Sequence, residues 1–99
     1  MTVAAADTVA DGLAARSVYE IPFLILQKQI QNVVLLSEDE LLEGVRLALR
    51  YTQNLAEVAG AAALAAAFKI KDHLRGKNVA VIMTGGNLGM TRLCQILAT

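Results

Sequence analysis

The sequence has few of the residues that build disulfide or metal sites. Its 99 residues include one cysteine, one histidine, one proline, two tyrosines, two phenylalanines and no tryptophan. A single cysteine excludes an internal disulfide, and one cysteine with one histidine cannot form a spaced cluster of metal ligands, so we expect no metal site. His73 lies in a polar stretch and is expected at the surface, whereas Cys94 follows an apolar helical pattern and is expected in the core.

The sequence also lacks an excess of either charge and any long apolar run. Nine basic and nine acidic residues cancel, and there is no basic stripe, which argues against nucleic acid as a partner. The longest apolar run, 58–68, is far too short to span a membrane. The first residues lack the basic region of a signal peptide, so we expect a cytoplasmic protein.

Apolar residues are in excess for such a short chain. They make up 56% of the sequence, and the mean hydropathy is +0.50. A chain of this size cannot bury so much apolar surface by itself. The excess therefore favours a segment of a larger domain or an obligate homo-oligomer. A compact alanine-rich core is the alternative.

Helical and strand signals alternate along the first half of the chain. The pattern predicts a helix over 20–31, with Pro22 in its first turn, and a short buried strand over 33–36. Ser37 and Glu40 form a capping-box pattern at the start of a second helix, which continues to about Thr52. Its inward positions are predicted to be Leu41, Val45, Ala48 and Leu49.

The second half repeats this alternation. The pattern predicts an alanine-rich helix over 56–68, a polar connection over 69–78, a strand over 79–83 and a final helix over 90–97. This order of elements predicts an α/β fold, with a partial parallel sheet flanked by helices in one unit covering residues 1–99.

The most informative stretch is the end of the second predicted strand. The β-branched run 79–83 leads directly into Thr84, Gly85, Gly86 and Asn87. Ligands of α/β folds bind at the carboxyl ends of strands, and two glycines allow a close backbone approach, so this turn is a candidate ligand site. The phosphate-binding glycine patterns of nucleotide sites are absent. Taken alone, this short motif favours a tight strand-to-helix connection over a ligand site.

Several segments together carry a family resemblance. The segments 8–14 and 33–41, the Ala-Glu-x-Ala-Gly-Ala stretch at 56–61, Gly-Lys at 76–77 and the hydroxyl-Gly-Gly-Asn turn at 84–87 occur in a familiar order and spacing. Over residues 7–97 the chain resembles the C-terminal part of the large catalytic domain of the threonine dehydratase and serine racemase family. These are fold type II enzymes that use pyridoxal phosphate.

The resemblance implies roles for individual residues in binding this cofactor. Thr84 matches the hydroxyl residue that hydrogen-bonds the pyridine nitrogen, and such a neutral donor does not protonate the ring. Gly85 and Gly86 would leave space at the ring edge, and Asn87 would brace the turn. Glu57 and Gly60 match the pocket-lining start of a helix.

The resemblance also implies which residue borders the substrate and which segment of the enzyme is absent from this sequence. Gly12 matches a turn that borders the substrate, L-threonine or L-serine in the parent enzyme. The Ser-x-Lys-x-Arg-type segment that supplies the Schiff-base lysine is absent from these 99 residues, so no catalytic residue is expected in this chain.

The resemblance thus implies a cytoplasmic lyase of amino-acid metabolism that removes ammonia from a hydroxy amino acid. The isolated chain is expected to be inactive and to need the N-terminal part of the catalytic domain as its partner. The alternatives are a non-catalytic module that binds an anion or a protein partner, or a helix-pairing oligomerisation segment.

Overall fold

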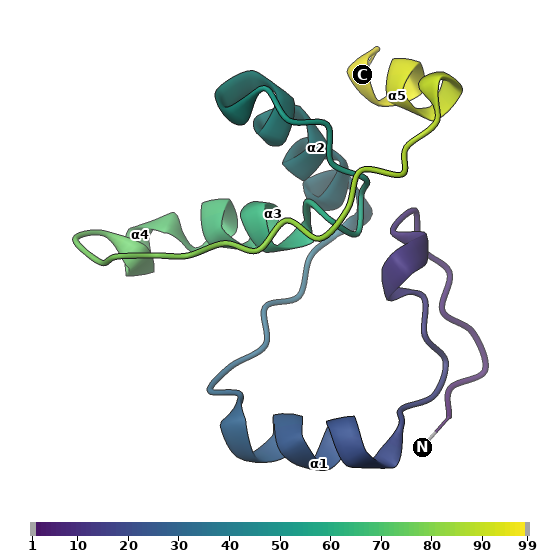
Figure 1. Ribbon diagram of the computed structural model, residues 1–99, viewed down its shortest axis with the longest axis vertical. Coiled ribbons are helices and arrows are strands. Elements are labelled where there is room, and N and C mark those ends of the chain that lie inside the picture. Colours follow the sequence, from purple (N-terminus) through teal and green to yellow (C-terminus); the bar gives the residue numbers. More distant parts are fainter. Residues whose placement is uncertain (1, 99) are drawn as a thin grey trace.

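The computed structural model describes residues 2–98 as an open arrangement of helices joined by extended segments (Figure 1). The elements in chain order are a short 3₁₀-helix η1 (Asp11–Leu13) and the α-helices α1 (Glu20–Gln29), α2 (Glu38–Thr52), α3 (Ala62–Lys69), α4 (Lys71–Leu74) and α5 (Met90–Leu97). The helical bounds predicted for α1, α2 and α5 are confirmed to within about two residues.

The core lies where α2 packs against α3 and α5. Gly44 of α2 lets α3 come close, because a Cβ at this position would lie 2.9 Å from the carbonyl oxygen of Ala61 and from the Cβ of Ala65. The predicted inward positions of α2 are confirmed for Leu41, Val45 and Ala48, while Leu49 packs against this core and is partly buried. The remaining buried apolar residues are Ala10, Leu47, Ala56, Val58, Ala61, Ala65 and Ile96.

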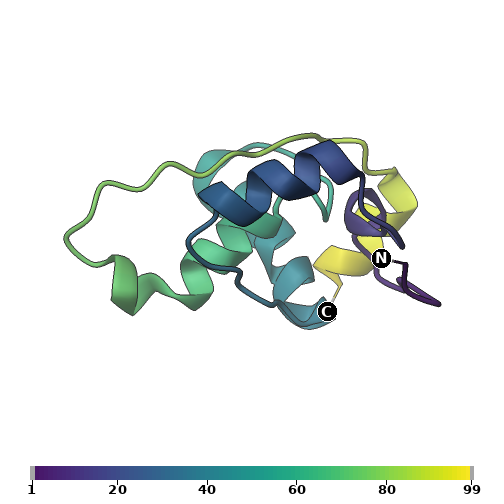
Figure 2. The same ribbon diagram turned by 90° about the horizontal axis from the view of Figure 1, so that it is seen from below.

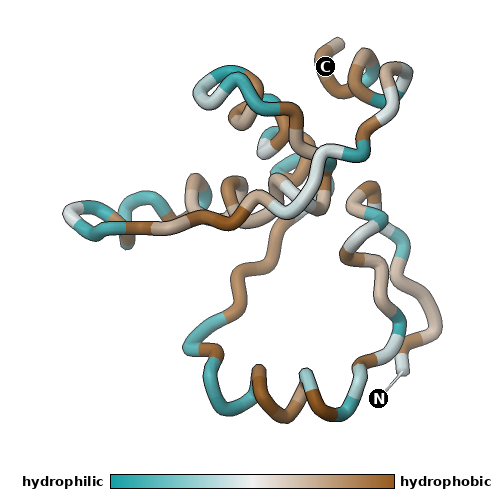
Figure 3. Tube along the Cα trace, viewed as in Figure 1, coloured by the Kyte–Doolittle hydropathy of each residue, from teal (hydrophilic) through white to brown (hydrophobic). Residues whose placement is uncertain are grey.

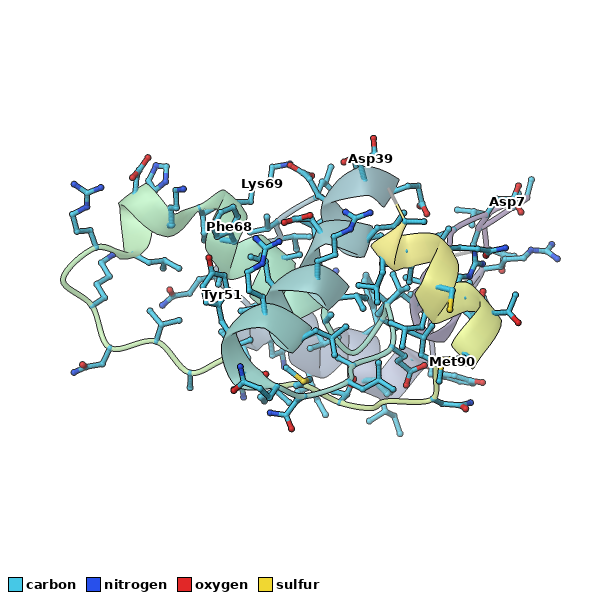
Figure 4. The ribbon with its side chains drawn as sticks, turned by 90° about the horizontal axis from the view of Figure 1, so that it is seen from above. Asp7, Asp39, Tyr51, Phe68, Lys69 and Met90 are labelled. Carbon is cyan, nitrogen blue, oxygen red and sulfur yellow. The ribbon has the colours of Figure 1, made fainter. Side chains whose placement is uncertain are left out.

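The capping box at the start of α2 is confirmed. The Glu40 N–H donates to Ser37 Oγ at 3.1 Å, and the Ser37 N–H donates to Glu40 Oε2 at 2.8 Å. Lys69 of α3, which is labelled in Figure 4, also binds Glu40 Oε2, at 3.0 Å, and it donates to the carbonyl oxygen of Leu35 at 2.8 Å. The start of α2 is thereby joined both to α3 and to the segment that precedes it.

Helix α1 stands apart from the other helices. Extended segments connect it at both ends, and a gap separates it from α2 and α3 in Figure 1. None of its residues is buried. The largely apolar run 21–26 lies between Glu20 and the polar stretch 27–29 (Figure 3), and Ile21 and Ile25 are 72% and 53% exposed.

The two predicted strands are not confirmed. Residues 33–36 and 79–83 are extended but form no ladder, and within residues 2–98 the only β-bridge is the antiparallel one between Thr2 and Ser17. Residues 79–88 run as a long extended segment along one side of the molecule (Figure 2). An extended segment becomes a strand only when a neighbouring backbone supplies hydrogen bonds, and neither segment has such a neighbour among the described residues.

Two further predictions need correction. The alanine-rich helix begins at Ala62 rather than at Ala56, because residues 57–61 form a turn held by a bond from the Ala61 N–H to the Glu57 carbonyl at 2.9 Å. Cys94 is exposed rather than in the core. The side of α5 that faces α2 is the one carrying Ile96, whose carbonyl accepts a 2.9 Å hydrogen bond from Arg46 Nε.

His73 is exposed on α4, as expected. No helix within residues 2–98 is both long enough and apolar enough to cross a bilayer.

Candidate functional site

The glycine turn at 84–87 lies against the turn that precedes α3. The Glu57 N–H donates a hydrogen bond to the Gly85 carbonyl at 3.0 Å, and the Leu88 N–H donates to the Gly86 carbonyl at 2.8 Å. The first bond joins two segments that are far apart in the sequence, and the second tightens the glycine turn itself. Candidate residues that were predicted from separate motifs therefore share one place in the structure.

The glycines at this place are required by close packing. A Cβ on Gly60 would lie 2.5 Å from the carbonyl oxygen and 2.9 Å from the nitrogen of Gly85. A Cβ on Gly85 would overlap Glu57 Oε1, and one on Gly86 would lie 2.6 Å from the carbonyl oxygen of Leu55. The contacts of Gly60 and Gly86 are with backbone atoms, so these two positions admit only glycine without a shift of the backbone, whereas the flexible Glu57 side chain could move away from a Cβ on Gly85.

Thr84 directly precedes Gly85 in the chain, next to this glycine contact. The residue is exposed, and its hydroxyl makes no hydrogen bond to any of residues 2–98. A hydroxyl can both donate and accept. The turn therefore offers one neutral polar group to a ligand, next to a backbone that two glycines keep free of side chains.

A small hollow of about 160 Å³ opens beside the turn. Its polar lining comes from Asp11, Glu57, Asn87 and Arg92, which belong to three separate parts of the chain. Asn87, predicted to brace the turn, is exposed and lines this hollow together with Glu57. Arg92 was missed by the sequence analysis; its position in the first turn of the helix that follows the glycine turn was the only available signal.

Gly12 joins the same neighbourhood from the N-terminal side. A Cβ on Gly12 would lie 2.9 Å from the Cβ of Ala59, so η1 packs directly on the turn that holds Glu57 and Gly60. This segment is held at the start of α2, where the Val9 N–H donates to Glu38 Oε2 at 2.7 Å. That bond, with a second from the Thr8 side chain, lowers the pKa of Glu38.

The polar groups at this place can bind and orient a ligand. Among residues 2–98 no three histidine, cysteine or acidic side chains lie close enough to hold a metal ion. The one histidine, His73, lies on α4 at the far end of α3 (Figure 1). A turn that offers a hydroxyl and a glycine backbone is typical of one wall of a ligand site.

Comparison of the sequence with known families identifies the family of this chain. The chain belongs to the pyridoxal-phosphate dependent enzyme family, which it matches over residues 1–85. Pyridoxal phosphate is therefore the cofactor that the family implies, and the resemblance drawn from the sequence motifs is confirmed.

Named relatives agree with this assignment. The chain is 30% identical to the L-threonine ammonia-lyase of Thermotoga maritima over 91% of its own length and 22% of that protein. It is 36% identical to the biosynthetic L-threonine dehydratase of Halalkalibacterium halodurans, over 88% of the chain and 21% of the relative. The chain thus spans about a fifth of the length of these relatives.

Solved structures show the same likeness in the backbone. The chain is similar to the T.th. threonine deaminase, with a TM-score of 0.82, 32% identity and coverage of 91% of this chain and 33% of that one. It is similar to a serine racemase from Dictyostelium discoideum, with a TM-score of 0.75, 31% identity and coverage of 85% and 28%. The fold-level resemblance is confirmed, although the parallel sheet is not formed by residues 2–98.

Proposed function

We propose that this chain forms the pyridine-nitrogen side of the cofactor pocket in a pyridoxal-phosphate dependent ammonia-lyase that acts on L-threonine or L-serine. The reaction would convert the hydroxy amino acid to a 2-oxoacid and ammonia. The observation that carries the proposal is the exposed Thr84 hydroxyl beside the contact between Gly60 and Gly85. The threonine ammonia-lyases and dehydratases among the relatives support the reaction class.

The residues of this turn fit the cofactor. The Thr84 hydroxyl has no partner within residues 2–98, and a donor of this kind can bond a ring nitrogen without giving up its proton. Pyridoxal phosphate, when bound, would act as the electron sink of the reaction. A neutral partner on its nitrogen moderates that capacity, which favours elimination over transamination. The Glu57 carboxylate, which occupies the space beside Gly85, would fix the turn in place.

Other steps of the reaction belong to the rest of the catalytic domain. The sequence has no Ser-x-Lys-x-Arg segment for covalent attachment of the cofactor. We therefore propose that the isolated chain is inactive, and that it works as the C-terminal segment of a larger domain with the N-terminal part as partner.

A chimera tests this proposal. The matched 90 residues of the Thermotoga maritima L-threonine ammonia-lyase would be replaced by the corresponding residues of this chain. Release of 2-oxoacid from L-threonine and L-serine would be measured, together with the absorption spectrum of the bound cofactor. We expect a chimera that binds the cofactor and is active.

Three substitutions in the chimera examine Thr84. Thr84→Ser keeps the hydroxyl and should be nearly neutral. Thr84→Ala should weaken transition-state binding by about 0.5–1.5 kcal/mol, as expected for one neutral hydrogen bond. Thr84→Asp should divert the reaction towards transamination, because a carboxylate stabilises a protonated ring nitrogen.

The matched control is Thr91→Ala, because Thr91 is an exposed threonine on α5, outside the glycine turn at 84–87. We expect its rate and spectrum to equal those of the unaltered chimera. If Thr84→Ala and Thr84→Asp also leave rate and spectrum unchanged, the Thr84 hydroxyl does not face the cofactor and the proposed role is wrong.

A further inference from the structure

The N-terminal segment 2–17 is hydrogen-bonded to the rest of the described chain at one side chain. The segment closes on itself through the antiparallel bridge between Thr2 and Ser17. Its hydrogen bonds to residues 18–98 all go to the carboxylate of Glu38, the first residue of α2. Within the described chain this carboxylate is therefore the polar anchor of the segment.

The Glu38 carboxylate orients three consecutive residues of the segment. Its Oε2 accepts the Val9 N–H at 2.7 Å, and the Thr8 hydroxyl donates to the same carboxylate. Thr8 Oγ1 in turn accepts the Ala10 N–H at 3.2 Å. The two bonds to the carboxylate favour its ionised form and lower the pKa of Glu38.

Packing alone does not fix the direction of this segment. Ala10, which is 1% exposed, is the only buried residue among 2–17, and Leu13 is 57% exposed. A buried methyl group excludes water but has no preferred direction. A hydrogen bond weakens steeply when its angle changes, so the bond to Glu38 supplies the orientation that the alanine contact lacks.

The anchored residues lead directly into the turn that carries Gly12. The Leu13 N–H donates to the Ala10 carbonyl at 2.8 Å, which forms η1. Gly12 within η1 lies against Ala59 in the turn before α3. The position of η1 relative to the site is therefore set on one side by the contact of Gly12 and on the other by Glu38.

Glu38 itself lies at a fixed point of the fold. The start of α2 is closed by the capping box of Ser37 and Glu40. Lys69 of α3 also binds Glu40, so α2 and α3 are joined at this point. A hydrogen bond from Glu38 therefore places the segment relative to both helices.

We propose that Glu38 is a positioning residue for the substrate side of the site, because it holds the Thr8–Val9 backbone and thereby sets the place of Gly12. Glu38 acts through this segment and does not touch the substrate. The inference rests on the proposed function, in which Gly12 borders the hydroxy amino acid and Thr84 faces the cofactor.

Hydrogen–deuterium exchange of the 99-residue chain tests the anchor without any cofactor. Glu38→Ala removes the acceptor, so we expect the Val9 amide to exchange at least about threefold faster. Glu38→Gln keeps an oxygen acceptor of similar reach and should restore most of the protection. Amides in the last two turns of α2 serve as the check that each variant is folded.

Asp39→Ala is the matched control. Asp39, which is labelled in Figure 4, is exposed in the same first turn of α2 and makes no hydrogen bond to residues 2–17. Its loss removes the same charge from the same end of the helix, so effects of net charge and of the helix dipole are common to both variants. We expect Asp39→Ala to leave the exchange of Val9 unchanged.

Steady-state kinetics test the role on the substrate side. The protein is a chimera of the kind described above that carries all of residues 2–98. Glu38→Ala should raise the KM for L-threonine and L-serine by about threefold to tenfold, as expected for the loss of one hydrogen bond to a charged group. The kcat and the absorption spectrum of the bound cofactor should stay the same, and Glu38→Gln should restore the KM. A mere loss of stability would instead reduce the amount of active enzyme and leave KM unchanged.

Each other outcome overturns part or all of the proposal. Unchanged exchange of Val9 in Glu38→Ala would show that the carboxylate does not hold the segment. Faster exchange with an unchanged KM, or an equal rise of KM in Asp39→Ala, would show that Glu38 does not set the substrate side. An unaltered chimera without activity would refute the proposed function and with it the substrate role of Glu38, whereas the exchange of Val9 would still decide whether Glu38 holds the segment. The two failures can therefore be distinguished.

Discussion

The backbone N–H of Glu57 donates a 3.0 Å hydrogen bond to the carbonyl oxygen of Gly85, and the backbone of Gly60 lies directly against the same residue. The turn before α3 and the glycine turn after the second extended segment therefore form one unit. Thr84 is positioned by this unit, so its orientation depends on residues from both turns.

Gly60→Ala should destabilise this unit. The new Cβ would lie 2.5 Å from a backbone oxygen, which cannot move aside as a flexible side chain can, so we expect a loss of about 1–3 kcal/mol in the free energy of unfolding. Urea denaturation followed by circular dichroism would measure it. Gly89→Ala is the control, because its Cβ would meet nothing within 4 Å, and a change as large as that of Gly60→Ala there would contradict this explanation.

Acid should weaken the start of α2. The Ser37 N–H and the Lys69 ammonium hold the pKa of Glu40 below its ordinary value of 4.5, and the Val9 N–H does the same for Glu38. Because both pKa values are lowered in the folded state, this stabilisation is present above about pH 4.5 and is lost as the pH falls further. Urea midpoints measured across this range should therefore decline in acid.

The substitution Glu40→Gln separates the contribution of Glu40 ionisation to stability from the contribution of its side chain to the capping box. Glutamine can still complete the capping box but does not ionise, so the acid-dependent part of the decline should shrink. Glu20→Gln, on the isolated helix α1, should leave the pH profile as it is. An unaltered profile in Glu40→Gln would show that the contacts of Glu40 do not control acid stability.

The chain alone should not attach pyridoxal phosphate at one specific lysine. The Ser-x-Lys-x-Arg segment is absent from the sequence, so none of its lysines has the surroundings for a specific bond. The measurement is mass spectrometry after mixing with pyridoxal phosphate and reduction with borohydride. A stoichiometric adduct at a single lysine would refute the prediction that the covalent chemistry resides elsewhere.

The chain alone should self-associate. Ile21 and Ile25 of α1 are 72% and 53% exposed, and apolar surface of this extent promotes association in water. Light scattering should detect a dimer or larger species, and replacing both isoleucines with lysine should shift the distribution to smaller species. A monodisperse monomer at high concentration would count against a segment that is normally covered by a larger domain.

Local signals were sufficient to predict α1, α2 and α5, but not the start of α3 or the short helix α4 inside the predicted connection 69–78. Ser37 and Glu40 fix the start of α2 because a capping box satisfies backbone groups within four consecutive residues. The inward positions Leu41, Val45 and Ala48 follow from helical periodicity. The family resemblance also came from the sequence alone, since its motifs are short and ordered, and the residues that it proposed for the cofactor do gather in one place.

Contacts between distant segments decided the rest. The approach of Gly60 to Gly85, the packing of Gly12 on Ala59 and the placement of Arg92 beside Glu57 depend on how separate turns meet, which no local pattern encodes. Cys94 is exposed because α5 turns Ile96 towards α2. The sequence alone established that residues 79–83 favour an extended backbone, but a strand needs a hydrogen-bonding neighbour, and only the tertiary structure shows that residues 2–98 supply none.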